Sequence, residues 1–204
     1  MNAKGFSLKP FPSADLLPHL KHLKITGEIC RKCNRLSVGY ALLGPLAKIV
    51  IPVPADIPVR MSALWENTCF EFFVASQDSD PYWEFNLSPA GHWNVYRFKS
   101  YRQDMREEPA FTSLPFDVRR HKDSFRISLK LDIDRIIPAD RILEAAVSAV
   151  IKYRNNKVTY WGLTHAGLQA DFHRRDSFII KLRPWNRDRR STEHPGNLKT
   201  TPVQ

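Results

Sequence analysis

The sequence is poor in cysteine and methionine and contains no long apolar run. Its 204 residues include three cysteines and three methionines. A low, odd number of cysteines does not indicate a disulfide framework. No segment approaches the roughly 18 consecutive apolar residues that a membrane-spanning helix needs. The N-terminal segment MNAKGFSLKPFPSADLLPHL has no continuous apolar core. We therefore expect no secretory signal, no membrane association and a cytoplasmic protein with reduced thiols.

The composition is that of a folded globular protein. Hydrophobic residues make up 43% of the chain and aromatic residues 11%, which is enough for a full core. The net charge of +10 suggests anionic surroundings, but the basic residues are scattered. Nucleic-acid binding would require a contiguous basic stripe with interleaved stacking aromatics, so we consider a nucleic-acid partner unlikely. We expect one domain over residues 1–184 and a basic, disordered tail over 185–204.

Alternation of apolar and polar residues with a period of two is the dominant pattern. It runs through residues 23–29 and 36–42, which are separated by a turn and predict a hairpin. Residues 48–53 predict a short strand between prolines, and residues 125–131 alternate cleanly. The segment 101–114 has no such pattern and predicts an irregular loop.

The middle and the end of the chain predict further strands. Residues 69–75, 82–87 and 93–100 are β-prone and are separated by the turn signals QDSDP and SPAG. Residues 141–153 could form a helix, but alternate positions are all apolar, and we favour a strand. Two more strands are expected at 158–163 and 177–182. The sequence thus predicts an all-β fold, a sandwich of about ten mostly antiparallel strands.

Three motifs carry a resemblance to a known family. They are WENTCFEFF, within residues 64–74, EFNLSPAG, within 82–98, and DFHRRDSF, within 160–182. Together they resemble an uncharacterised branch of small proteins in the DOMON-like superfamily, which includes the family-9 carbohydrate-binding modules. The resemblance covers about residues 23–182. It implies a sandwich with a ligand cleft on one face, and related members bind sugars or haem.

The resemblance also implies candidate site residues. In the sugar-binding relatives, a tryptophan six residues before a glutamate supplies a stacking surface and a hydrogen-bond acceptor. Trp65 and Glu71 match that spacing. Phe172 stands where those relatives have a second tryptophan, and Asn86 where they have a basic residue. Gln169 corresponds loosely to an amide-bearing residue of the late loop.

The chemistry of sugar binding agrees with such a set. Flat rings contact the C–H faces of a sugar, and polar groups bind its hydroxyls. Trp65, Trp83, Trp93 and Phe172 could supply rings, although alternation predicts that Trp83 belongs to the core. Six extended residues span ~20 Å, so Trp65 and Glu71 can contact one ligand only if the chain bends at residues 66–68. A surface ion pair of Glu71 with Arg97 or Lys99 is an equally open reading.

Other chemistry has weaker support. Cys30 and Cys33 lack a second ligand pair for zinc and the strand-to-helix setting of a redox motif, so we expect no role and no metal site. His165, His173, Asp171 and Asp176 form a cluster that could act as an acid or base, but no activated nucleophile in a recognisable motif accompanies it. We therefore expect a protein that is not an enzyme. Haem would need a His with a Met or a second His, and Met61, Met105, His92, His165 and His173 match no motif.

These observations predict a non-catalytic module that binds a small molecule, a sugar or a related polyhydroxylated compound, without a cofactor. The predicted ligand-binding residues are Trp65, Glu71, Asn86, Arg97, Phe172 and His173. The basic surroundings further suggest an anionic ligand, oriented by Arg97 or His173. A haem-binding electron-transfer domain is the first alternative, and a weak anion or nucleic-acid binder is the second.

Overall fold

The structure is a computed structural model that describes residues 2–12 and 22–184. The described residues form twelve strands and short 3-10 helices, and all pairings between the strands are antiparallel. The strands are β1 (Asn2–Pro10), β2 (Lys24–Lys32), β3 (Arg35–Leu43), β4 (Cys69–Ser76), β5 (Tyr82–Leu87), β6 (Trp93–Phe98), β7 (Arg106–Glu107), β8 (Phe116–Arg120), β9 (Ser124–Asp132), β10 (Leu143–Lys152), β11 (Val158–Gly162) and β12 (Ile180–Leu182). The 3-10 helices are η2 (Leu46–Lys48), η3 (Leu64–Glu66) and η4 (Arg175–Ser177). Within this part of the chain, no helix is long and apolar enough to cross a membrane.

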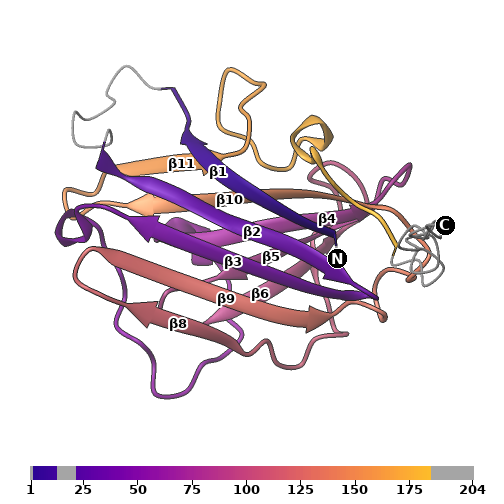
Figure 1. The fold of residues 1–204 in the computed structure, drawn as a ribbon, viewed down its shortest axis with the longest axis horizontal. Coiled ribbons are helices and arrows are strands. Elements are labelled where there is room, and N and C mark those ends of the chain that lie inside the picture. The colour runs from indigo at the N-terminus through magenta and orange to yellow at the C-terminus, as the bar shows by residue number, and fades with distance from the viewer. Residues whose placement is uncertain (1, 13–21, 185–204) are drawn as a thin grey trace, which may run out of the picture.

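The strands form two layers that are connected at one edge (Figure 1). The continuous strand order is β7-β6-β5-β4-β10-β11-β1-β2-β3-β9-β8, with β12 paired to β10 beside this path. Strand β1 joins the layers because it pairs with β2 along most of its length and with β11 at its C-terminal end. The prediction of an all-β, mostly antiparallel sandwich is confirmed.

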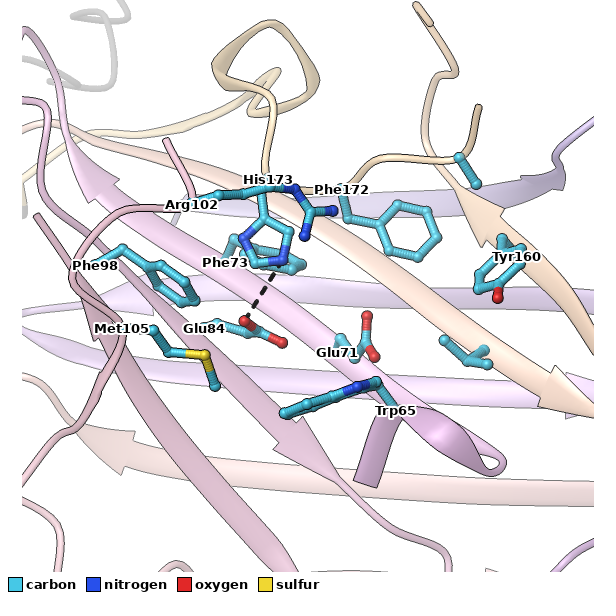
Figure 2. A pocket seen from close by; sticks show the side chains of 12 residues that line it. Trp65, Glu71, Phe73, Glu84, Phe98, Arg102, Met105, Tyr160, Phe172 and His173 are labelled. Atoms are coloured by element: carbon cyan, nitrogen blue, oxygen red, sulfur yellow. Dashed lines mark ion pairs between the residues drawn. The ribbon is translucent and has the colours of Figure 1, made fainter. Parts of the chain in front are cut away.

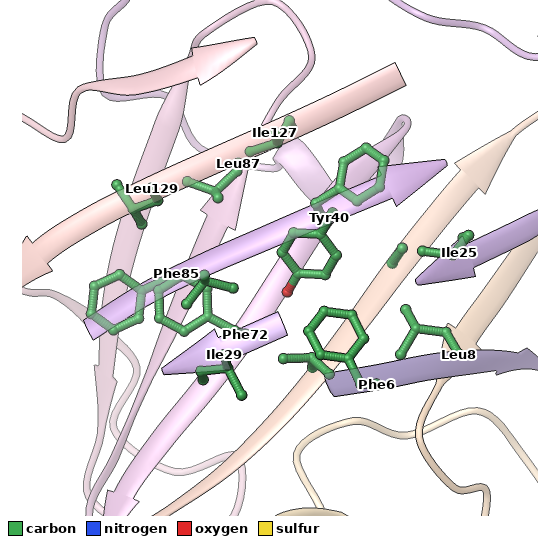
Figure 3. Close-up of a cluster of buried hydrophobic side chains, with 14 of the residues drawn as sticks. Phe6, Leu8, Ile25, Ile29, Tyr40, Phe72, Phe85, Leu87, Ile127 and Leu129 are labelled. Carbon is green, nitrogen blue, oxygen red and sulfur yellow. The ribbon is translucent and has the colours of Figure 1, made fainter. Parts of the chain in front are cut away.

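The main core lies between the two layers (Figure 3). Alternate residues of β3, namely Leu36, Val38, Tyr40 and Leu42, face it and are buried, as the sequence pattern predicts. From the other layer, Phe72 and Phe85 stack at a centroid distance of 4.4 Å. Trp83 and Trp93 also belong to this core, so they are not available as sugar-stacking rings.

Strands β4, β5 and β10 are buried on both faces. All residues of β5 and nearly all residues of β4 and β10 are buried, although only alternate residues face the main core. A second apolar cluster covers the outer face and includes Phe73, Tyr82, Phe98 and Phe178. This explains why apolar residues also occur between the alternate core positions of residues 141–153. The strand that we favoured there is confirmed.

Several strand boundaries differ from the prediction. Residues 48–53 form no strand: η2 precedes a single bridge between Ile49 and Tyr153, because prolines on both sides remove the donors of a longer ladder. Residues 177–182 begin as η4 and contain only the short β12. The sequence pattern missed β1, β7 and β8. Strands β7 and β8 are short, rich in charged residues and lie at the sheet edges, whereas β1 contains Gly5 and ends at Pro10, both of which weaken a strand pattern. The predicted tail, 185–204, lies outside the described residues.

Strands β1, β2, β3, β9 and β8 form the front layer, and Gly27 allows close packing between three of them. It pairs with Phe6 on one side and with Tyr40 on the other, and those two rings contact edge to face at 5.4 Å. A Cβ at Gly27 would overlap the carbonyl oxygen of Gly39 and the ring of Phe6. The absence of a side chain here is therefore a condition for the packing of β1 on β2.

We predict that Gly27→Ala lowers the free energy of unfolding by about 1–3 kcal/mol, because the backbone or the Phe6 ring must shift. Gly39→Ala is the matched control: a Cβ there has its nearest neighbour at 3.9 Å. We expect the control to stay within about 0.5 kcal/mol of the wild type. Chemical denaturation measures both variants, and equal stabilities would contradict this account of Gly27.

Candidate functional site

A pocket of about 320 Å³ opens on the outer face of β4, β5 and β10. It lies outside the main core, on the face that the loops around residues 98–105 and 163–174 partly cover (Figure 2). Its volume is at the lower end of the range for small-molecule sites. The residues that line it are Trp65, Glu71, Phe73, Glu84, Phe98, Arg102, Met105, Val150, Tyr160, Ala170, Phe172 and His173.

Trp65 reaches this pocket because the chain turns sharply before β4. Ala63 has a left-handed backbone, with φ 57°, and leads into η3, which carries Trp65. The predicted bend between Trp65 and Glu71 is therefore present, and both side chains line one pocket (Figure 2). The indole is 37% exposed and contacts Tyr96 edge to face at 5.7 Å. It is therefore a large aromatic surface that a ligand in the pocket can reach.

Glu71 projects from the middle of β4 into the floor of the pocket and is 3% exposed. Its Oε2 accepts a hydrogen bond from the Ser148 hydroxyl on β10 at 3.0 Å. On the opposite side of the strand, the Tyr40 hydroxyl of the front layer donates to the backbone carbonyl of Glu71. Burial and the neighbouring charge of Glu84 raise the pKa of Glu71 to about 8, against the effect of the Ser148 hydrogen bond.

Glu84 lies beside Glu71 on the same floor. In the sheet register, Glu71 pairs with Asn86, two residues along β5 from Glu84, so the two carboxylates are diagonal neighbours on one face. Glu84 is 4% exposed, and its Oε1 accepts a hydrogen bond from the Asn86 amide at 2.9 Å. Burial raises the pKa of Glu84 to about 7, although the Asn86 hydrogen bond and the Arg102 charge oppose this shift.

His173 forms the side of the pocket next to Glu84. Its Nδ1 lies 2.8 Å from the Tyr82 hydroxyl and its Nε2 lies 3.8 Å from Oε2 of Glu84. The rings of Phe73 and Phe98 contact the imidazole edge to face. Burial, together with the Arg102 charge, lowers the pKa of His173 to about 4, while Asp171 acts in the opposite direction. The imidazole is therefore neutral at physiological pH.

Arg102 lies at the mouth of the pocket and is held by Asp171. Its Nη2 contacts Oδ1 of Asp171 at 2.9 Å, and the Tyr101 hydroxyl also donates to this carboxylate. The backbone of Arg102 is left-handed, with φ 52°, and its N–H donates to the Tyr82 hydroxyl at 3.2 Å. These contacts join the loop after β6 to the loop before η4 above the carboxylates.

A second aromatic surface faces the pocket opposite Trp65. Phe172 is half-buried and lies 6.3 Å from the ring of Tyr160 on β11 and 6.4 Å from the ring of His165. Tyr160 is exposed and lines the pocket with Phe172 (Figure 2). The floor is thus acidic, and rings stand on opposite sides of it.

The structure brings four of the six predicted residues to this pocket: Trp65, Glu71, Phe172 and His173. Asn86 is 0% exposed and lies beneath the lining, where it donates to Glu84 and accepts from the Cys69 thiol. Arg97 lies on the other face of the sheet, exposed, with its guanidinium 5.8 Å from the Trp83 ring. Arg97 therefore does not line this pocket, because residues 93, 95 and 97 of β6 share the inner face. Among the described residues, Glu71 forms no ion pair with Arg97 or Lys99.

Four lining residues that matter to the chemistry were not predicted: Glu84, Arg102, Met105 and Tyr160. Glu84 and Asn86 are two residues apart in the predicted strand 82–87, so they share a face, but the sequence does not indicate that this face is covered. Arg102 and Met105 come from the irregular segment 101–114, whose position depends on the distant contact with Asp171. No local pattern indicates them.

Most of the candidate haem ligands lie outside this pocket. Among the described residues, no group of three or more His, Cys, Asp and Glu side chains is arranged to hold a metal ion. Of the Met and His residues considered for haem, only Met105 and His173 line the pocket. Both ring nitrogens of His173 already face protein groups, Tyr82 and Glu84, so iron ligation would break this arrangement. Cys30 is buried, whereas Cys33 is exposed in the hairpin turn after β2.

The fold of this chain also occurs in solved structures of other proteins. No protein-family model matches the sequence, and no curated protein is detectably similar to it. Solved structures do match. The chain shares its fold with family-9 carbohydrate-binding modules. One such module from Caldicellulosiruptor kristjanssonii, in complex with glucose, has a TM-score of 0.51 at 11% identity over 91% of this chain and 86% of its own. In complex with cellotriose, such a module has a TM-score of 0.54 at 10% identity over 96% and 89%.

A third structure agrees with these two. It is a protein from Bacteroides uniformis to which carbohydrate binding has been attributed, with a TM-score of 0.61 at 12% identity. The match covers 87% of this chain and 86% of that chain. At such identities the likeness concerns the arrangement of strands, and side chains in the pocket must be judged by their own chemistry.

The buried carboxyl pair predicts a pH dependence of stability. The folded chain retains protons on Glu71 and Glu84 at a pH where the unfolded chain has lost them, since their pKa values are raised to about 8 and about 7. The free energy of unfolding therefore falls as the pH rises between about 6.5 and 8.5. His173, whose pKa is lowered, acts in the opposite direction only below about pH 6.5, the usual histidine value.

We predict that Glu71→Gln gains stability relative to the wild type by more than about 1 kcal/mol over this pH range, because the amide has no charge to bury. Denaturant titrations at both ends of the range measure the difference. The control is Glu66→Gln on η3, whose exposed carboxylate stays hydrated in the folded and unfolded chain. If both variants follow the same pH profile, the carboxyl of Glu71 is not desolvated.

Proposed function

We propose that this protein is a non-catalytic module that binds a sugar or a related polyhydroxylated small molecule in the pocket at Trp65 and Glu71. The observation that carries the proposal is the convergence of an exposed indole and a buried carboxyl on one small cavity. An aromatic face covers the apolar side of a sugar ring, and a carboxyl binds its hydroxyls. Trp65 and Phe172 would provide the two faces, and Glu71 the polar contact.

The fold and the sequence motifs support the same function. Neighbours that share the fold include modules in complex with glucose and with cellotriose. The motifs around Trp65, Asn86 and Phe172 resemble the DOMON-like superfamily, and we propose that this chain is a distant member of it. The pocket also lies on one face of the sandwich, where the resemblance implied a cleft.

The chemistry of the pocket supports binding rather than catalysis. The Cys69 thiol beneath the floor has a pKa raised well above its usual value by burial, so it is protonated and a poor nucleophile. The neutral imidazole of His173 is engaged with Tyr82 and Glu84. A general base must be free to reach a proton of the substrate, and His173 is not. Turnover of nitrophenyl glycosides by the purified protein would contradict this part of the proposal.

We predict that Trp65→Ala weakens sugar binding by more than tenfold and lowers the free energy of unfolding by about 1–2 kcal/mol. The ring is 37% exposed, so its removal should cost less than the ~3–5 kcal/mol of a core tryptophan. Isothermal titration with a panel of mono- and disaccharides measures binding, and denaturant titration measures stability. Trp161→Ala, at a residue that is 2% exposed, gives the core reference.

Met61→Ala is the matched control for binding, because Met61 is exposed beside η3 but does not line the pocket. It should leave sugar affinity unchanged. Trp65→Ala binding as well as the wild type would overturn the assignment of the stacking ring. A Soret band on titration with haem, without any response to sugars, would favour the haem reading instead. Affinity that falls steeply with salt would favour an anion or nucleic-acid binder.

A further inference from the structure

The pocket has an acidic floor in a protein of net charge +10. Glu71 and Glu84 are both at least nine-tenths buried and both line the cavity. Among the described residues of the lining, Arg102 alone carries a fixed positive charge, and Asp171 holds it at 2.9 Å. Arg102 is therefore already ion-paired to Asp171, and Glu71 accepts a hydrogen bond from the neutral Ser148 hydroxyl.

Two other shielded carboxylates of this protein, Glu144 and Glu108, have a cation or a hydrogen-bond donor at each oxygen. Glu144 forms ion pairs with Arg175 at 2.7 Å and with Lys181 at 3.5 Å. Glu108 accepts hydrogen bonds from the Trp83 indole at 2.8 Å and from the backbone N–H of Ala110 at 3.0 Å. Burying a carboxyl without a cation is unfavourable, and such groups in a cavity are candidates for ligand contact. Among the described ion pairs, neither Glu71 nor Glu84 is paired with a lysine or an arginine, and both line the pocket.

The walls of the pocket suit a positive charge as well. The rings of Trp65, Phe73, Phe98, Tyr160 and Phe172 all line it. The negative face of an aromatic ring attracts an ammonium group, and the attraction grows when both groups are shielded from water. Carboxylates beneath and rings around the same cavity form a setting in which a protonated amine is better solvated than a neutral hydroxyl.

We propose that the ligand carries a protonated amino group that binds at Glu71 and Glu84, so that the sugar is an amino sugar with a free amine. This inference rests on the sugar-binding function proposed above and specifies its substrate class. It replaces the sequence-based expectation of an anionic ligand. The ammonium takes the place of the missing cation at the floor, and Trp65 and Phe172 cover the faces of the sugar ring.

Affinity should then depend on pH in a defined direction. The free protein holds protons on Glu71 and Glu84 near neutral pH, and an arriving ammonium displaces them. Lowering the pH opposes that release and weakens binding. The other groups around the site do not reverse this dependence of affinity on pH. Ser148 is neutral, Arg102 is ion-paired and the pKa of Asp171 is lowered. His173 is already neutral, and the pKa values of Cys69, Tyr82 and Tyr96 are raised.

The experiment compares glucosamine, glucose, N-acetylglucosamine and cyclohexylamine by isothermal titration. We expect glucosamine to bind at least tenfold more tightly than glucose and N-acetylglucosamine at about pH 7, and to lose at least tenfold in affinity at about pH 5. Glu71→Gln and Glu84→Gln should each remove the preference for glucosamine over glucose. Glu66→Gln, at an exposed position outside the pocket, should leave that preference unchanged.

Each other outcome separates the two proposals. Equal binding of glucose and glucosamine, at both pH values, would overturn the ammonium site and leave the sugar-binding function standing. Cyclohexylamine binding as tightly as glucosamine, with no response to glucose, would support the ammonium site and overturn the sugar as ligand. No binding of any of the four compounds would overturn both.

Discussion

Burial of the central strands on both faces is the constraint on which the site depends. In an antiparallel sandwich, one face of each sheet commonly meets water, and polar residues on that face remain hydrated. Here the outer face of β4, β5 and β10 is covered by Phe178, Phe98 and the loops that carry Arg102 and His173. A carboxylate on that face is consequently removed from water. Its protonation state and its hydrogen-bond partners then govern which ligands it can bind.

The two sheets also position the site jointly. The Tyr40 hydroxyl crosses the core from β3 to the backbone carbonyl of Glu71, so the front layer is hydrogen-bonded directly behind the carboxyl. Beneath the floor, Asn86 connects the carboxyl of Glu84 to the thiol of Cys69. Such supporting contacts hold the side chains of a binding site in place and reduce the entropy that a ligand must overcome.

Local patterns in the sequence were sufficient for most of the strands and for part of the site. Alternation identified β3, β9 and β10, and the spacing of Trp65 and Glu71 required a bend that η3 provides. Strand phase placed Glu84 with Asn86, but whether a sheet face is covered depends on loops that pack from elsewhere. Arg102 is located by Asp171, far along the chain, and its backbone is left-handed without being glycine. Arg97 was selected for its charge. Its strand phase, which it shares with residues 93 and 95, places it on the inner face instead.

Strand β1 occupies an unusual position, with one edge on β2 and its last residues on β11. During synthesis on the ribosome, β1 and β2 emerge well before β11. The layer that bears the pocket therefore cannot close onto the layer of β1 and β2 until β11 has also left the exit tunnel. Pairing between such distant segments is slow, and unpaired strand edges are prone to association in the meantime. Production of the protein in cells should accordingly respond to chaperones that shield nascent β-strands.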